Sequence, residues 1–258
     1  MKKRMYMPLA AMFLTLTAAI SVSAGKEGGV DAAQPEVDTL ALDGGSVIYP
    51  DSVNPAAIEE DVTNDLSASD AFIRMPAQVL DLLTNSMRLD MLDLYGDPTR
   101  KVMNTMEGYS SILHPLTPDY LKASLTPVST LEIKILKYKK FPLVVAVYTV
   151  GDTLTAYDSD IRFYSRNMKE LPREKFIKIA ELKDFIRPGV SRAGRDSVLD
   201  AIPFPTVEYL LSPDSATLEA HLTVSDYLGR EQAEKVSPLL LTSRRYQWDG
   251  KKFKMEKI

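Results

Sequence analysis

The sequence contains no cysteine and only two histidines, and these shortages exclude several kinds of chemistry. Without cysteine there is no disulfide, thiol nucleophile, iron–sulfur cluster or thiolate zinc site. With only His114 and His221, a histidine-rich metal site is excluded as well. We therefore expect a fold held together by packing alone, with no metal site and no cofactor.

The sequence also lacks an excess of basic residues. Lysine and arginine total 31 against 35 aspartates and glutamates, and the first 24 residues hold three of those cations, so residues 25–258 carry 28 against 35, or −7. Nucleic-acid binding needs a basic footprint, so we expect no nucleic-acid partner.

Several catalytic and nucleotide-binding motifs are missing. The sequence has no Gly-x-Ser-x-Gly nucleophile turn, no phosphate-cradling Gly-x-x-x-x-Gly-Lys and no dinucleotide glycine fingerprint. No specific motif in the sequence therefore indicates a catalytic activity.

The first 24 residues have the three parts of a secretory signal peptide. A basic start at Lys2, Lys3 and Arg4 precedes the apolar stretch 5–20, and small residues end at Ala24. The apolar stretch is shorter than the roughly 20 residues that cross a bilayer, so we predict cleavage rather than membrane retention. We thus expect a chain exported to the periplasm or cell surface, with no transmembrane anchor after cleavage.

Residues 25–68 are rich in glycine, alanine, proline and acidic residues and have few large apolar ones. Such a composition cannot offset the entropy of ordering, which predicts a flexible leader, partly ordered near residues 47–58. Val47, Ile48 and Tyr49 suggest a short strand or a contact with the body.

Apolar residues recur at helical spacing after Pro76, from Leu80 to Leu94, and Gly96 supplies an end signal. This predicts a helix over residues 76–95, with a weak point at 84–86. A second helix is predicted over 174–186, and the Ser/Gly/Pro-rich segment 190–205 is predicted to be a loop.

The rest of the sequence is β-rich. Alternating charged and apolar residues in 131–138 indicate a sheet with one face in water. The Asp249-Gly250 dipeptide predicts a tight hairpin turn. The predicted strands are 120–126, 130–138, 143–150, 160–164, 206–211, 217–224, 239–248 and 252–258.

These patterns predict an α+β fold with helices packed on one face of a mainly antiparallel sheet. The order of elements suggests a first α+β unit over residues 69–171 and a second over 172–258. The two are either related helix-plus-meander units or parts of one continuous sheet.

Two pairs of aspartates are the candidate catalytic residues. Asp90 and Asp93 lie three apart on the predicted helix, and Asp158 and Asp160 lie two apart at a predicted strand start. Glycoside cleavage needs two carboxyl groups about 5–10 Å apart, which either pair could supply. The competing interpretation is a polar helix face for the first pair and a turn followed by a same-face strand pair for the second.

Four other residues are candidates for binding. Arg192 and Arg195, in the predicted loop, could clamp an anionic ligand, although exposed arginines in such a loop are more often only solvated. Tyr246 and Trp248, in a predicted strand, could contribute to a carbohydrate or peptide surface, although strand aromatics more often pack the sheet.

Several residue clusters resemble a family of exported Bacteroidetes proteins classed as a domain of unknown function. The resemblance covers residues 50–170 and implies an envelope or surface location, but no catalytic residues. The clusters that carry it are Phe72 with Met75-Pro76, Arg88 to Met91 with Asp93 and Tyr95, Gly108 with Ser110, Leu116-Thr117 with Asp119 to Leu121, and Asp158-Ser159 with Ile161, Phe163 and Tyr164.

Three functions follow from these patterns. The leading hypothesis is a non-catalytic binding or scaffold protein of the envelope that recognises a protein, a peptide or a glycan through its sheet or a sheet edge. The alternative is a hydrolase of cell-wall or dietary polymer that uses paired aspartates. The third is a self-associating structural component.

Overall fold

The computed structural model describes residues 66–97, 99–152, 155–224 and 228–258. The predicted signal peptide and the predicted leader as far as residue 65, with its possible strand at 47–49, lie outside the described residues. Within the described ranges, no helix is long and apolar enough to cross a membrane.

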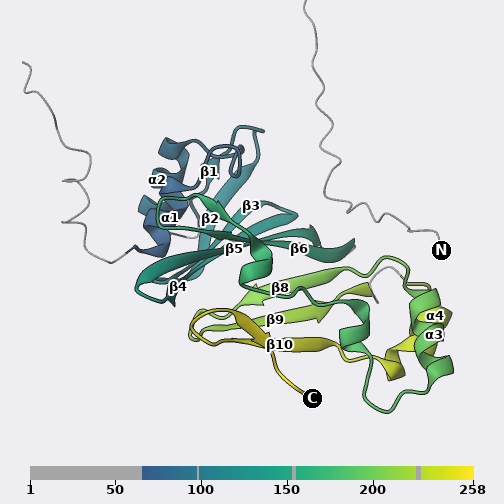
Figure 1. The fold of residues 1–258 in the computed structure, drawn as a ribbon. Coiled ribbons are helices and arrows are strands. Elements are labelled where there is room, and N and C mark those ends of the chain that lie inside the picture. Colours follow the sequence, from purple (N-terminus) through teal and green to yellow (C-terminus); the bar gives the residue numbers. More distant parts are fainter. Residues whose placement is uncertain (1–65, 98, 153–154, 225–227) are drawn as a thin grey trace, which may run out of the picture. The chain divides into compact units, whose positions relative to one another are not determined.

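The larger of two sheets has seven antiparallel strands that follow one another in sequence order (Figure 1). Short turns favour such a meander, because they allow each strand to pair with the next one in antiparallel orientation. Its strands are β1 (Val102–Met103), β2 (Tyr109–Thr117), β3 (Tyr120–Thr126), β4 (Ser129–Tyr138), β5 (Phe141–Asp152), β6 (Thr155–Tyr164) and β7 (Glu170–Leu171).

The smaller sheet has four antiparallel strands in the order β11-β10-β9-β8. The predicted Asp249-Gly250 turn joins its last two strands, where Trp248 faces Phe253 across the hairpin. The strands are β8 (Val207–Leu211), β9 (Thr217–Leu222), β10 (Ser243–Trp248) and β11 (Phe253–Met255).

Short helices complete the fold, and their ends follow local capping chemistry. The Ser67 hydroxyl and the Asp70 carboxylate form a capping box at the start of the first helix, and Thr84 caps the second. The α-helices are α1 (Ala68–Arg74), α2 (Asn85–Asp93), α3 (Arg192–Ala201) and α4 (Arg230–Val236), and the 3-10 helices include η3 (Arg173–Lys175), η4 (Leu182–Phe185) and η6 (Ser237–Leu239).

Two apolar cores lie on opposite faces of the larger sheet. On one face, α1 and α2 pack on the sheet through residues such as Phe72, Met91 and Ile133. On the other face, Phe163 belongs to the core that includes Tyr209 of the smaller sheet. The predicted fold class, α+β with helices on a mainly antiparallel sheet, is confirmed. In the sequence, all strands of the larger sheet precede residue 172 and all strands of the smaller sheet follow it. The second core contains residues of both sheets.

The helix predicted over residues 76–95 is too long. The structure has only α2, because Thr84 caps a new helix and the preceding turn carbonyls, including those of Met75 and Leu80, accept hydrogen bonds from Arg88. Helix α1, which starts inside the predicted leader at Ala68, was not anticipated.

Two further predictions were wrong. Residues 174–186 contain η3 and η4 instead of an α-helix, because tertiary partners satisfy part of their backbone: the Ala180 N–H donates to the Tyr209 hydroxyl, and the Lys178 carbonyl accepts from Tyr246. The predicted loop 190–205 contains α3, which begins where the Ser191 hydroxyl accepts from the Gly194 N–H. Strand β2 was also missed.

Candidate binding site at the open edge of strand β4

Strand β4 continues beyond the end of its neighbour β3. Pairing between the two strands begins with Tyr120 opposite Lys134, and the Ile135 N–H donates to the Asp119 carbonyl at 2.8 Å. Beyond this bond, β4 pairs with β5 as far as Tyr138. Among the described residues, no strand lies along the β3 side of this last part of β4.

The backbone of Lys137 lies on this open side. Alternate residues of a strand direct their backbone N–H and C=O groups to the same side. The backbone groups of Lys137 therefore face the β3 side, as those of Ile135 do. The Lys137 carbonyl accepts a hydrogen bond from Trp248 Nε1 at 3.1 Å, which agrees with that direction. The edge therefore offers the N–H of Lys137 to a partner, while the carbonyl of the same residue is already hydrogen-bonded to Trp248.

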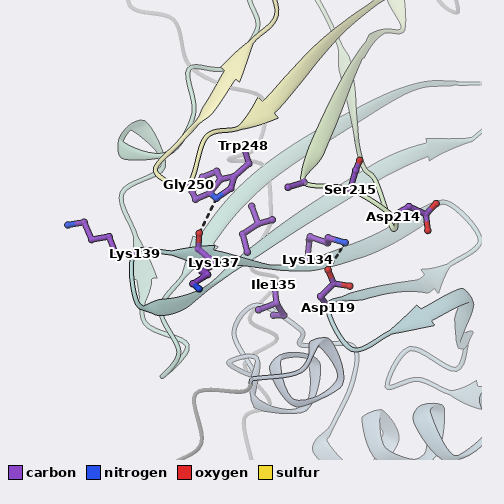
Figure 2. A pocket seen from close by; sticks show the side chains of 11 residues that line it. Asp119, Lys134, Ile135, Lys137, Lys139, Asp214, Ser215, Trp248 and Gly250 are labelled. Atoms are coloured by element: carbon purple, nitrogen blue, oxygen red, sulfur yellow. Dashed lines mark hydrogen bonds and ion pairs between the residues drawn. The ribbon is translucent and has the colours of Figure 1, made fainter.

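A hollow of about 560 Å³ lies along this edge (Figure 2). It is enclosed by the end of β4, the turn before β3, the β8–β9 turn and the β10–β11 turn. We call it the β4-edge hollow. Its lining residues are Asp119, Lys134, Ile135, Leu136, Lys137, Lys139, Asp214, Ser215, Ala216, Trp248 and Gly250.

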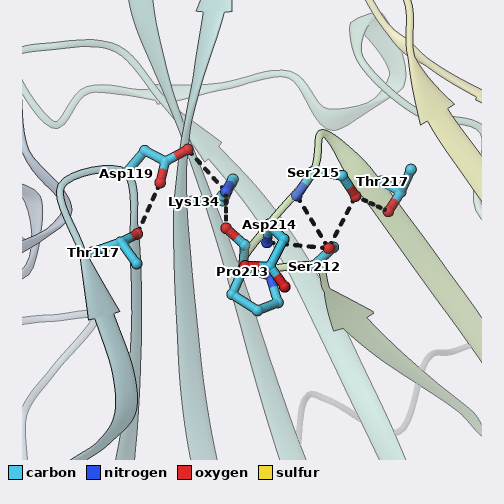
Figure 3. A network of polar contacts seen from close by, with 8 residues as sticks. All are labelled: Thr117, Asp119, Lys134, Ser212, Pro213, Asp214, Ser215 and Thr217. Atoms are coloured by element: carbon cyan, nitrogen blue, oxygen red, sulfur yellow. Dashed lines mark hydrogen bonds and ion pairs between the residues drawn. The ribbon is translucent and has the colours of Figure 1, made fainter.

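A buried lysine joins three sides of the hollow (Figure 3). The Lys134 side chain is only 4% exposed, and its ammonium group lies 2.8 Å from Asp119 Oδ2 and 2.7 Å from the Pro213 carbonyl. A buried ammonium is costly unless paired, and here Asp119 supplies the opposite charge and Pro213 a second acceptor. Lys134 thus fixes the β8–β9 turn against the larger sheet.

Asp119 is the anionic partner in this arrangement. Burial tends to raise the pKa of its carboxyl group, but hydrogen bonds from Lys134 and Thr117 outweigh burial and hold the pKa below its usual value. Asp119 therefore stays ionised at neutral pH, and the Lys134 charge is neutralised within the protein.

Side-chain hydrogen bonds also shape the β8–β9 turn. The Ser212 hydroxyl accepts from the N–H groups of Asp214 and Ser215, and the Ser215 hydroxyl lies 2.7 Å from that of Thr217. These bonds are drawn in Figure 3. Such hydroxyl-stabilised turns hold their backbone without help from neighbours, so this wall of the hollow is preformed.

Lys137 and Lys139 are the exposed cations of the hollow, and Asp214 is an exposed anion. Since Asp119 already neutralises Lys134, the two exposed lysines leave one positive charge in excess over Asp214. The hollow is thus mildly cationic although the chain as a whole is acidic.

The candidate aspartates of β6 do not line this hollow. The Asp158 carboxylate accepts from the Val207 N–H at 3.2 Å. Although the residue keeps access to solvent, partial burial of its carboxyl group raises the pKa. Asp160 forms ion pairs with Arg162 and Arg173, at 2.7 and 3.1 Å. Both carboxylates are therefore engaged by protein groups.

The remaining sequence candidates are spread over the fold. Asp90 and Asp93 are exposed on α2, and Arg192 and Arg195 are exposed on α3. Tyr246 is 1% exposed, and its hydroxyl donates to a backbone carbonyl in the core. The structure brings none of these residues into the β4-edge hollow.

Of the predicted binding residues, Trp248 alone lines the hollow, and no sequence pattern singled out the other lining residues. The alternation in 131–138 predicted a face in water, but Glu132 and Lys134 on that face are both buried under the smaller sheet. That prediction was wrong because their charges meet Lys122 and Asp119 within the fold.

No group of three or more His, Asp or Glu side chains in the described ranges is placed to hold a metal ion. The features above define an α+β protein of two antiparallel meanders with an open, mildly cationic hollow at a strand edge. The chain belongs to the family of proteins of unknown function DUF3256, which matches residues 63–253. The predicted resemblance to a domain of unknown function is thereby confirmed.

A solved structure shares the fold. A domain of an uncharacterized protein from Porphyromonas gingivalis W83 is 22% identical, with a TM-score of 0.64, over 74% of this chain and 98% of that one. Among curated proteins, none matches this chain. These comparisons leave export and binding as predictions.

Proposed function

We propose that this chain is an exported, non-catalytic binding protein of the bacterial cell envelope, which binds an extended segment of another protein in the β4-edge hollow. The observation that carries the proposal is the open backbone of β4 at Lys137, beside a hollow of about 560 Å³. Extended peptides bind open strand edges through main-chain hydrogen bonds, and side-chain pockets add specificity.

The envelope location is supported by the sequence. The basic start, short apolar stretch and small residues of positions 1–24 are typical of an export signal. A cysteine-free, acidic body is compatible with an exported protein that needs no oxidative folding.

The burial of Trp248 favours a peptide over a glycan. Sugars stack on exposed aromatic faces, but Trp248 is only 9% exposed and its indole N–H is already bonded to the Lys137 carbonyl. The hollow offers instead a backbone amide and two exposed lysines. We therefore expect a partner segment that carries an acidic residue near the Lys137 and Lys139 side chains.

The contacts of the β6 aspartates favour binding over hydrolysis. A general acid and a nucleophile must both reach the substrate, whereas Asp158 caps a backbone amide and Asp160 is held by two arginines. Turnover of an envelope polymer by the wild-type chain, lost in an Asp158→Ala/Asp160→Ala variant, would contradict the non-catalytic proposal.

Photo-crosslinking tests where a partner binds. A benzophenone side chain is placed at position 137, with a matched substitution at Arg245, which is exposed on the smaller sheet, and both proteins are exposed to native envelope. We expect a defined crosslinked peptide from position 137 alone. Equal crosslinking from both positions would count against the site.

A synthetic copy of the crosslinked segment then tests the binding mode. Lys137→Pro removes the edge N–H, whereas Lys137→Ala keeps it and removes only the cation. Calorimetry should show affinity lost by at least about tenfold with proline, and less with alanine, as expected for a main-chain bond. If the proline variant binds as well as wild type, strand addition is wrong.

A further inference from the structure

A second hollow lies between helix α2 and strand β2, and it differs in character from the first. Its volume is about 310 Å³, within the range of small-molecule sites. Its lining contains no residue of the β4-edge hollow. We call it the α2–β2 hollow.

The deep part of the α2–β2 hollow is apolar. Met91 of α2, Val102 of β1 and Ile112 of β2 line it, and each is at most 9% exposed. Ser110 also lines it, but its hydroxyl donates to the Leu125 carbonyl at 2.7 Å and accepts from Asn104. Since that hydroxyl is satisfied inside the protein, these four buried lining residues present mainly carbon to a ligand.

The mouth of the hollow carries charge of both signs with a positive excess. Arg100 and Lys101 are exposed lining residues, and Asp97 is the lining anion. One Asp97 oxygen accepts from Thr99, and the other lies 3.3 Å from the Arg100 guanidinium. Asp97 is therefore already partnered, while Arg100 keeps further N–H groups and Lys101 keeps its charge.

The wall beside the mouth is held by a tyrosine–histidine contact. The Tyr95 hydroxyl accepts from the Leu116 N–H at 2.9 Å and lies 2.8 Å from His114 Nδ1, and the centroids of the two rings are 4.6 Å apart. The turn that follows helix α2 is thereby tied to strand β2 on one side of the hollow.

We propose that the α2–β2 hollow binds a small amphipathic anion, whose apolar body contacts Met91, Val102 and Ile112 and whose acidic head meets Arg100 and Lys101. A wholly polar ligand would lose hydration against the apolar floor, and an uncharged one would forgo the cationic mouth. This site is independent of the proposed peptide site on β4.

The probe for this proposal is decanoate, below its micelle concentration, with decanol and butyrate as partial ligands. Decanol keeps the tail and loses the charge, and butyrate keeps the charge and shortens the tail. Backbone-amide NMR shifts of the full mature chain report both affinity and location. We expect saturable binding of decanoate with shifts at β2 and α2, and affinities weaker by on the order of tenfold for either partial ligand.

Charge variants separate this site from the first one. The double variant Arg100→Glu/Lys101→Glu should weaken decanoate binding by on the order of tenfold, whereas Lys137→Glu/Lys139→Glu makes the same charge change at the β4-edge hollow and should leave it unaltered. Equal weakening in both variants, equal binding of decanol and decanoate, or shifts confined to other surfaces would each overturn the proposal. Loss of peptide binding at β4 has no bearing on this result.

Discussion

The Leu211 N–H donates to Glu132 Oε2 at 2.7 Å, which joins strands β8 and β4 across 79 positions of sequence. The same edge of β8 directs the Tyr209 N–H to the Ser159 hydroxyl and the Val207 N–H to Asp158. Three alternate amides of an edge strand are thus satisfied by side chains of the other sheet. Because these amides are already bonded, the edge of β8 cannot accept a further strand.

Glu132 should therefore matter for stability. Glu132→Leu leaves the buried Leu211 amide unpaired and deprives Lys122 of a partner at 2.7 Å, so we expect a loss of about 2–4 kcal/mol in the free energy of unfolding by urea titration. Glu132→Gln keeps an acceptor and should lose less. Glu219→Gln, in the partly exposed part of β9, is the control; if it matches Glu132→Leu, the buried bond has no special role.

Arg88 is predicted to hold α1 in place. It is 1% exposed and donates to the carbonyls of five residues, namely Phe72, Ile73, Met75, Leu80 and Leu83. Arg88→Lys keeps the charge but cannot fan out over these carbonyls, so we expect a loss of at least about 3 kcal/mol and faster hydrogen exchange in α1. The exposed Arg74→Lys should change neither measurement, and unaltered exchange in Arg88→Lys would refute the role.

Asp119 predicts a specific acid response. Its pKa is held below the usual value in the folded state, so its contribution is present above the unfolded pKa near 4 and is lost as pH falls through the folded pKa. Asp119→Asn should lower stability at pH 7 by no more than about 1 kcal/mol, since this side chain is half exposed, and should flatten the stability profile below pH about 4. The exposed Asp93→Asn makes the same charge change, and a profile like that of Asp119→Asn would contradict the assignment.

Gly151 is predicted to tolerate no side chain. Its φ is +135°, and an added Cβ would lie 2.8 Å from the Ala156 carbonyl oxygen and from the Tyr157 Cα. Gly151→Ala should therefore cost more than about 2 kcal/mol in unfolding free energy. Gly250→Ala, at φ +89° with open space around it, carries backbone strain alone and should cost about 1 kcal/mol. Equal costs would show that the clash is relieved.

Local patterns predicted most strands because alternation and turn dipeptides act over a few residues. The strand 120–126 and the Asp249-Gly250 hairpin were placed correctly from such signals. Helices were placed less well, because the apolar residues of 174–186 pack through tertiary contacts that no local period describes. The burial of Glu132 and Lys134 could not be foreseen, since their partners lie on other strands and in the β8–β9 turn.

The residues that carry the family resemblance have structural roles in the fold. Arg88 anchors α1, Asp119 pairs with Lys134, and Ser110 joins β2 to β3 through the Leu125 carbonyl. A pattern built from such positions identifies a fold reliably. It says little about ligands, which explains why the β4-edge hollow was not anticipated from it.

Trp248 is the sole tryptophan of the chain, and its indole N–H is bonded to the carbonyl at the open strand edge. Its fluorescence therefore originates from the wall of the hollow and from nowhere else in the protein. A molecule that binds against this wall changes the polarity or rigidity around that ring, so we expect occupancy to be followed by emission without a label attached.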